Sequence, residues 1–202
     1  YTFDFCDYLI ELVHEGEVPM SRIDDATRRI LNLKYELGLF ETPNTYLEDY
    51  TDFSGKYFER IAYQSATESI TLLKNENDIL PLHKEVKVLV TGPNSNSMRT
   101  LNGGWSYSWQ GEKLEEFAEH FYTISEAIVQ KIGPNQVNQI DGVSYDFDGK
   151  YYQEKDINIQ VAVKVAKSVD YIVLCLGENS YCEKPGDLHD LYLSENQTEL
   201  AL

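Results

Sequence analysis

The sequence predicts an α/β fold with a mainly parallel sheet that helices cover on both faces. Two β-branched apolar runs, at 86–90 and 171–176, are typical of buried strands, because each leads directly into a glycine turn. Two segments between them carry apolar residues at helical spacing, at 124–132 and 162–169. Strands that alternate with helices indicate a parallel sheet, whose functional loops lie at the carboxyl ends of the strands.

The first 41 residues predict two helices. The first ends at Gly16 and carries apolar residues at helical spacing, namely Phe5, Leu9, Leu12 and Val13. The second is predicted to begin at Ser21, which forms a capping-box-like pattern with Asp24, and to end at Gly38.

Residues 42–53 have the composition of a connecting segment, with Pro43, Asn44 and aromatic residues that follow no period. We place a domain boundary there and expect a second domain over 54–202. It is predicted to open with a helix that ends near Ser69, followed by a strand over 70–73.

Two later helices have recognisable starts. Thr123 and Glu126 form a capping box before the apolar residues of 124–132. Asp156 is predicted to open the helix whose apolar positions lie at 162–169.

Charge argues against two classes of partner. The 202 residues include 17 Lys and Arg against 34 Asp and Glu, which gives a formal net charge of −17. Phosphate backbones and anionic lipid surfaces are repelled by such a chain, so we expect neither nucleic acid nor membrane as a partner. No apolar run approaches the roughly 20 residues that a membrane-spanning helix needs.

The cysteines do not indicate a disulfide framework. Cys6, Cys175 and Cys182 are odd in number and match no metal-ligand spacing, so we interpret them as free thiols. They leave the compartment undecided, with a periplasmic or secreted location among the alternatives.

Common catalytic signatures are missing. The first predicted strand is followed by Thr91-Gly92-Pro93-Asn94, which lacks the glycine pattern of a dinucleotide site. The chain has no G-x-S-x-G elbow and no H-E-x-x-H pair. The four histidines are isolated in sequence, which favours packing or surface roles: His14, His83, His120 and His189.

A polar, glycine-bracketed loop contains both tryptophans, Trp105 and Trp109, in the sequence GGWSYSWQG. Exposed indole rings suit the C–H faces of sugars, and neighbouring Gln and Ser side chains can meet hydroxyl groups. The alternative, that both indoles fill a core beneath the loop, is equally compatible with the spacing.

A second polar segment follows the last predicted strand, in the sequence GENSYCEKPGD. It places Glu178 and Glu183 five residues apart at the carboxyl end of a strand. By composition alone, such a segment is more typical of a solvated acidic loop than of a catalytic one.

Four segments in this order resemble family 3 glycoside hydrolases. RIDDATRRILNLKYELGLFE resembles the end of the (β/α)₈ barrel of that family, and ATESITLLKNENDILPL resembles the entry into its α/β-sandwich domain. GGWSYSWQG and GENSYCEKPGDLHDLYLSENQTEL resemble two active-site segments of the sandwich. The resemblance implies that residues 1–41 end a barrel domain and that 54–202 begin the sandwich.

The resemblance also implies a retaining, exo-acting β-glycosidase that acts on β-glucosides or related β-glycosides. The glutamate of Y-x-E-x-x-G-D, here Glu183, is the implied acid/base, and Glu178 is implied to be structural. Trp109 is the implied platform for the leaving-group sugar, with Trp105 as its support. The implied partners are a carbohydrate substrate and the rest of the same enzyme, and neither a metal nor an organic cofactor is implied.

The S-D-W-type nucleophile segment of the family and its clamps for the terminal sugar are expected upstream of Tyr1, so we expect this piece alone to be inactive. A non-catalytic carbohydrate-binding or scaffold module is the alternative. The shorter family branch that acts on N-acetylglucosaminides fits less well, because it typically lacks the second domain.

Overall fold

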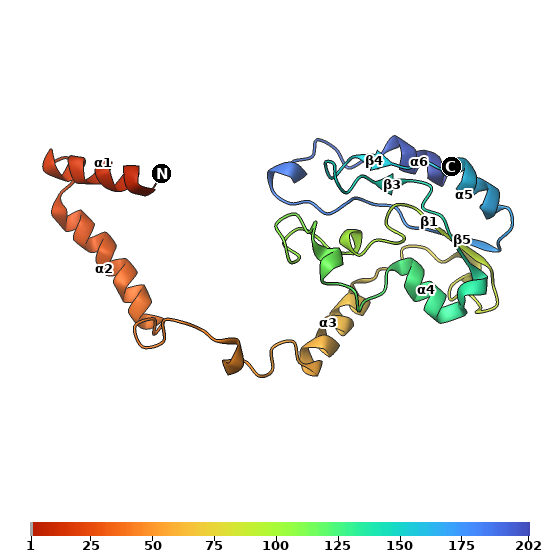
Figure 1. Ribbon diagram of the computed structural model, residues 1–202, viewed down its shortest axis with the longest axis horizontal. Coiled ribbons are helices and arrows are strands. Elements are labelled where there is room, and N and C mark those ends of the chain that lie inside the picture. Colours follow the sequence, from red (N-terminus) through yellow and green to blue (C-terminus); the bar gives the residue numbers. More distant parts are fainter. Residues whose placement is uncertain (1) are drawn as a thin grey trace. The chain divides into compact units, whose positions relative to one another are not determined.

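The computed structural model describes residues 2–202, and the chain divides into two compact units, one up to Lys74 and the other Asn75–Leu202 (Figure 1). The first contains three α-helices and a short 3-10 turn: α1 (Thr2–His14), α2 (Met20–Glu36), η1 (Leu47–Asp49) and α3 (Lys56–Ser69).

The three predicted helices of this unit are confirmed, but the predicted cap of α2 is wrong. The N-cap is Pro19 and makes no side-chain hydrogen bond, so Ser21 already lies inside the first turn, where it cannot cap. The end of α2 is as predicted, because Gly38 adopts φ +68° and the N–H of Leu39 donates to the carbonyl of Lys34 at 3.0 Å.

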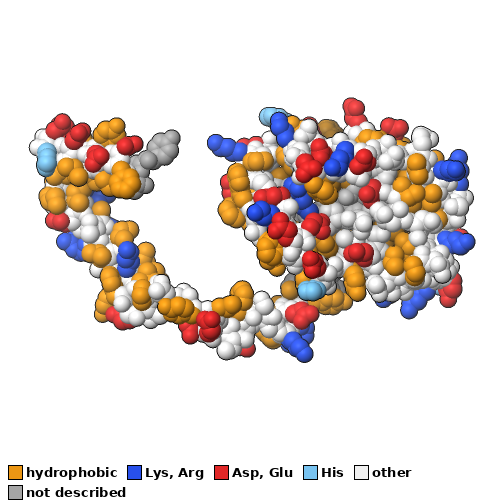
Figure 2. Space-filling view, in the orientation of Figure 1, with side chains coloured by type: hydrophobic (Ala, Val, Ile, Leu, Met, Phe, Trp, Pro, Cys, Tyr) orange, Lys and Arg blue, Asp and Glu red, His pale blue; other side chains and the backbone are white. Residues whose placement is uncertain are grey.

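The predicted strand at 70–73 is also wrong, since these residues form no strand and pair with no neighbour among the described residues. Their apolar side chains remain exposed, and an extended run without a partner strand has no ladder to join. Hydrophobic side chains likewise cover much of the visible surface of α1 and α2 (Figure 2). Our assignment of 1–41 to a barrel and of 42–53 to a linker stays a prediction.

The second unit contains the parallel sheet that the sequence predicts. Its order is β2-β1-β5, with both neighbours parallel to β1. The strands are β1 (Val88–Thr91), β2 (Val137–Gln139) and β5 (Tyr171–Leu174). Strand β2 was not predicted, because its residues Val-Asn-Gln carry only one apolar side chain and become a strand through their pairing with β1.

Helices lie on opposite sides of this sheet (Figure 1), as the sequence predicts. Val88 and Val90 are buried against apolar residues of α4 (Ile124–Ile132), and α5 (Ile159–Ala166) also contacts β1. The capping box of α4 is present. Helix α5 begins three residues later than predicted, because Asp156 adopts φ +52°, which a helix cannot contain.

Two further features complete the part of the unit that carries the site: the hairpin of β3 (Ser144–Tyr145) and β4 (Glu154–Lys155), and the short helix α6 (Glu195–Ala201). Long loops follow the carboxyl ends of β1 and β5. None of the helices in residues 2–202 has the length and apolar character to cross a membrane.

Candidate functional site

The tryptophan loop follows β1 and is closed on itself, because the N–H of Trp105 donates to the carbonyl of Trp109 at 2.9 Å. Trp105 is 70% exposed and Trp109 is 49% exposed. The interpretation in which the indoles fill a core is therefore wrong. Trp105 and Tyr107 both adopt positive φ, and the ring of Tyr107 stacks on Phe117 with centroids 4.4 Å apart.

The carboxylate of Glu112 organises the end of this loop. It accepts a hydrogen bond from Ser108 Oγ at 2.7 Å and another from the N–H of Gln110 at 3.0 Å. The bond from Ser108 is the main cause that lowers the pKa of Glu112 below its ordinary value. Glu112 is therefore anionic at neutral pH.

Gln110 joins the tryptophan loop to the loop after β5. Its Oε1 accepts from the backbone N–H of Cys182 at 2.9 Å, and its Nε2 donates to the carbonyl of Cys182 at 3.2 Å. The Cys182 thiol also donates to the carbonyl of Trp109 at 3.0 Å. Trp109 and Glu183 thus lie on two joined loops at the carboxyl edge of the sheet, where a parallel sheet gathers its functional loops.

Two glycines allow this close approach. A Cβ atom at Gly104 would lie 2.6 Å from the Cβ of Cys182, and one at Gly111 would lie 2.7 Å from the carbonyl oxygen of Gly103. Gly111 also adopts φ +73°, a conformation that favours glycine. A larger residue at Gly104 would push the two loops apart, whereas one at Gly111 would clash within the tryptophan loop and its Cβ would lie 3.2 Å from Ser180 Oγ of the other loop.

Glu183 is exposed and adopts φ +54° with ψ −142°. Its carbonyl accepts from the N–H of Gly186 at 2.7 Å, which starts a single turn over Lys184–Gly186. Non-glycine residues in this conformation cost about 1–3 kcal/mol and persist where the surroundings fix them, often at functional sites. The strained backbone thus falls on the glutamate that sequence reasoning selected.

The other loop glutamate is held by a tyrosine. Tyr181 donates its hydroxyl proton to Glu178 Oε2 at 2.8 Å. This hydrogen bond, with a smaller effect of burial, raises the pKa of Tyr181 to about 12. The ring of Tyr181 also contacts Tyr151 of the hairpin, with centroids 4.6 Å apart.

A buried network fixes the point where this loop leaves β5. The carbonyl of Gly177 accepts from the Tyr145 hydroxyl at 2.7 Å, and its N–H donates to Gln197 Oε1 at 3.0 Å. Gln197 is only 2% exposed. Burial raises the pKa of Tyr145 well above its ordinary value, so the hydroxyl remains a donor.

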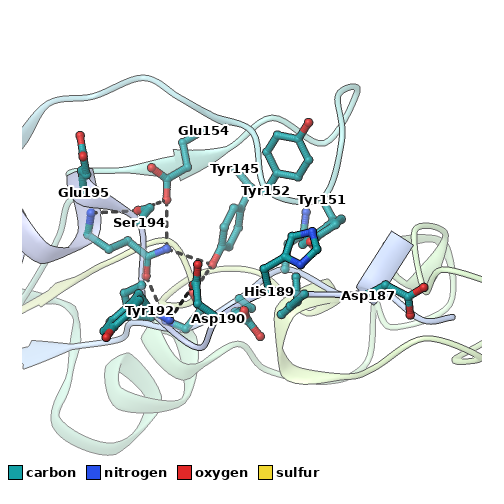
Figure 3. Close-up of a pocket in the computed structure, with 16 residues that line it drawn as sticks. Tyr145, Tyr151, Tyr152, Glu154, Asp187, His189, Asp190, Tyr192, Ser194 and Glu195 are labelled. Carbon is teal, nitrogen blue, oxygen red and sulfur yellow. Dashed lines mark hydrogen bonds between the residues drawn. The ribbon is translucent and has the colours of Figure 1, made fainter. Parts of the chain in front are cut away.

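The same network fixes the other end of the loop, at the start of α6 (Figure 3). Glu154 accepts from Ser194 Oγ at 2.7 Å, from Asn196 Nδ2 at 2.9 Å and from Gln197 Nε2 at 3.0 Å. Ser194 in turn accepts from the N–H of Gln197 and caps α6. Glu154, Ser194 and Gln197 line a cavity of about 480 Å³ between the hairpin and the loop.

Sequence reasoning missed this supporting network. Tyr145, Glu154 and Gln197 lie in segments without a catalytic motif, and the pairs that they form are 20 to 52 residues apart in sequence. Gln110 was visible in the W-Q-G segment, but its partner 72 residues away was not. Residues 2–202 contain no cluster of three or more side chains suited to hold a metal ion.

Comparison with known proteins gives the family. The model of the glycosyl hydrolase family 3 C-terminal domain matches residues 70–202. The lysosomal beta glucosidase of Dictyostelium discoideum is 38% identical over 95% of this chain and 24% of its own length. The periplasmic beta-glucosidase of Salmonella typhimurium is 31% identical over 87% of this chain and 25% of its own.

A solved structure agrees. The crystal structure of a beta-glucosidase from Listeria innocua in complex with glucose superimposes with a TM-score of 0.72 at 27% identity, over 96% of this chain and 24% of that protein. The chain thus spans about a quarter of the length of these relatives. Together with the match over 70–202, these similarities show that the chain belongs to glycosyl hydrolase family 3.

Proposed function

We propose that this chain is part of a retaining, exo-acting β-glycosidase for β-glucosides or related β-glycosides, in which it supplies the acid/base half of the active site. Glu183 is the proposed acid/base, and Trp109 is the proposed platform for the leaving-group sugar. Trp105 supports Trp109 through the hydrogen bond that closes the loop. The nucleophile and the clamps for the terminal sugar belong to the barrel part of the longer enzyme.

The proposed chemistry has two steps. Glu183 first donates a proton to the glycosidic oxygen while the nucleophile attacks the anomeric carbon, so the C–O bond breaks and the leaving group departs as an alcohol. The deprotonated Glu183 then takes a proton from water, which attacks the glycosyl-enzyme and releases the sugar. Retaining enzymes place their two carboxyl groups about 5 to 5.5 Å apart.

The pairing of Gln110 with the backbone of Cys182 is the observation that carries this proposal. It holds the residue after Trp109 against the residue before Glu183. A sugar that stacks on Trp109 therefore lies near Glu183, the proposed proton donor for its glycosidic oxygen. The strained backbone of Glu183 is independent support.

Substitution of Glu183 in the full-length enzyme tests the role of this residue. Glu183→Ala should reduce the hydrolysis of phenyl β-glucoside far more than that of 2,4-dinitrophenyl β-glucoside, whose leaving group needs little proton assistance. Added azide should restore turnover and give a β-glycosyl azide. Glu178→Gln, which keeps an acceptor for Tyr181, is the matched control. Equal losses on both substrates without azide rescue would exclude Glu183 as the acid/base.

The isolated chain supplies a second test. Covalent catalysis needs both carboxylates, so we expect the purified 202-residue chain to lack aryl-glucosidase activity. Turnover near the typical enzyme value of about 10 per second that is lost on Glu183→Ala would show that the nucleophile lies inside the chain.

A further inference from the structure

A second cavity lies beside the proposed catalytic loops. It has a volume of about 570 Å³, within the range of roughly 300–1,000 Å³ that is usual for small-molecule sites. Its walls come from three separate segments: the tryptophan loop, the β3–β4 hairpin and the loop after β5. They include Arg99, Gln110, Phe147, Lys150, Tyr151 and Pro185.

Arg99 is the unusual member of this wall. It is only 7% exposed, and its Nε donates to Ser180 Oγ at 3.0 Å. Its guanidinium carbon lies 5.3 Å from the centroid of the Phe147 ring. Neither terminal nitrogen has a hydrogen-bond partner among residues 2–202. Arg99 lines the cavity, so these N–H groups are available to an acceptor that enters it.

Charges around the guanidinium select the class of that acceptor. Burial lowers the pKa of Arg99, and the nearby carboxylates of Glu112 and Glu115 raise it. These two carboxylates therefore already offset the positive charge of the guanidinium. Glu112 also lines the cavity and is anionic. A phosphate or carboxylate ligand would be repelled by Glu112, whereas neutral hydroxyl groups would not.

The remaining walls suit a sugar ring. Phe147, Tyr151 and Tyr152 offer aromatic surfaces for the C–H faces of a pyranose. Gln110 and the guanidinium of Arg99 offer planar polar groups for its hydroxyls. Apolar faces combined with a few convergent polar groups are typical of small-ligand sites.

The position of the cavity relates it to the proposed reaction. Gln110 directly follows Trp109, and Pro185 lies two residues after Glu183. We propose that this cavity is a further sugar subsite, which receives the unit beyond the one stacked on Trp109, with Arg99 donating to its hydroxyls. The proposal rests on the proposed function and extends it from disaccharides to β-linked oligosaccharides.

Chain-length dependence in the full-length enzyme tests the subsite. The substrates are cello-oligosaccharides or laminari-oligosaccharides, whichever series the parent enzyme cleaves faster. The assay compares kcat/KM for the trisaccharide with kcat/KM for the disaccharide of that series. We expect Arg99→Met to lower the trisaccharide-to-disaccharide ratio about tenfold, as expected for the loss of a charge-assisted hydrogen bond. Arg99→Lys should recover part of the ratio. Lys131→Met on the exposed side of α4 is the matched control and should leave it unchanged.

Phe147→Ala covers the case in which Arg99→Met fails to fold, because Phe147 is half-exposed and its truncation should also lower the ratio. An equal effect on both substrates, or no effect, would overturn the subsite. Binding of the trisaccharide to the Glu183→Ala enzyme, measured by calorimetry, separates the two proposals. If the parent enzyme hydrolyses no β-glucoside, the proposed function is wrong. The subsite is then judged by binding alone: it is supported if Arg99→Met weakens trisaccharide binding about tenfold, and it is wrong if binding is unchanged.

Discussion

Glycine at position 183 should stabilise the fold while it removes the proposed acid/base. The backbone there adopts φ +54° and ψ −142°, a conformation that glycine populates freely and other residues do not. Relief of the backbone strain at this position is worth about 1–3 kcal/mol. The extra freedom of glycine in the unfolded chain costs about 0.4–1 kcal/mol. We therefore expect Glu183→Gly to exceed Glu183→Ala in unfolding free energy by about 0.5–2 kcal/mol.

Thermal unfolding of the 202-residue chain measures this difference. Tryptophan fluorescence reports on the second unit, because both tryptophans lie in it. The glycine variant should melt about 1–8 °C higher than the alanine variant, at about 2–4 °C per kcal/mol. Both variants lose the same charge, so electrostatics cancel.

A matched pair of variants in a helix, Glu199→Gly and Glu199→Ala, should show a stability difference of the opposite sign. Glu199 lies in α6, where glycine is less favourable than alanine by about 0.5–1 kcal/mol. If Glu183→Gly melts no higher than Glu183→Ala while the Glu199 pair behaves as expected, the strain at position 183 is absent and the reasoning fails.

Two other predictions concern contacts around the site, and a third concerns a buried thiol. Gln110→Ala should remove about 1–3 kcal/mol of hydrogen bonding to Cys182 and lower kcat/KM for phenyl β-glucoside about 5- to 150-fold in the full-length enzyme; the exposed-surface variant Gln160→Ala should not. Gln197→Leu leaves a buried N–H without an acceptor and should lower the unfolding free energy by about 1–3 kcal/mol in urea; an unchanged midpoint would contradict this. The pKa of the buried Cys175 thiol is raised, so less of it is thiolate at pH 8, and peptide mass spectrometry should find it unmodified when the native chain is treated with iodoacetamide.

Local signals predicted the elements that local interactions determine. The capping box of Thr123 and Glu126 acts within four residues, and the structure contains both of its hydrogen bonds. The αL glycine at the end of α2 is equally local. The misplaced start of that helix shows the limit, because Pro19 can occupy the N-cap and Ser21 offers a similar signal two residues later.

Elements that have a weak local signal and depend on distant pairing were not predictable. β2 has one apolar residue and exists because it pairs with β1, about 50 residues earlier. Conversely, the apolar run at 70–73 has strand propensity but no neighbouring strand among the described residues, so it remains irregular. A single sequence contains no information on which of these short segments finds a partner.

In the candidate site, too, local motifs could be read from the sequence and distant contacts could not. Trp109 and Glu183 were proposed as site residues because each lies in a motif, and a parallel sheet gathers the loops that follow its strands at one edge. Their roles stay predictions. The partners of these loops were not identified, because the hydrogen bonds of Gln110 and Gln197 reach across 72 and 20 residues. These contacts depend on loop conformation, which no periodicity encodes.

These contacts also explain how a glutamate can remain in a strained conformation on an exposed loop. The loop is fixed where it leaves β5, through Gly177, and again at the start of α6, through Ser194 and Glu154. Between these ends, Cys182 is held by Gln110 directly before Glu183. With three fixed points, the segment has little freedom to relax, so the strain at position 183 is sustained by hydrogen bonds that lie within residues 75–202. The placement of the glutamate is therefore supported by hydrogen bonds within residues 75–202.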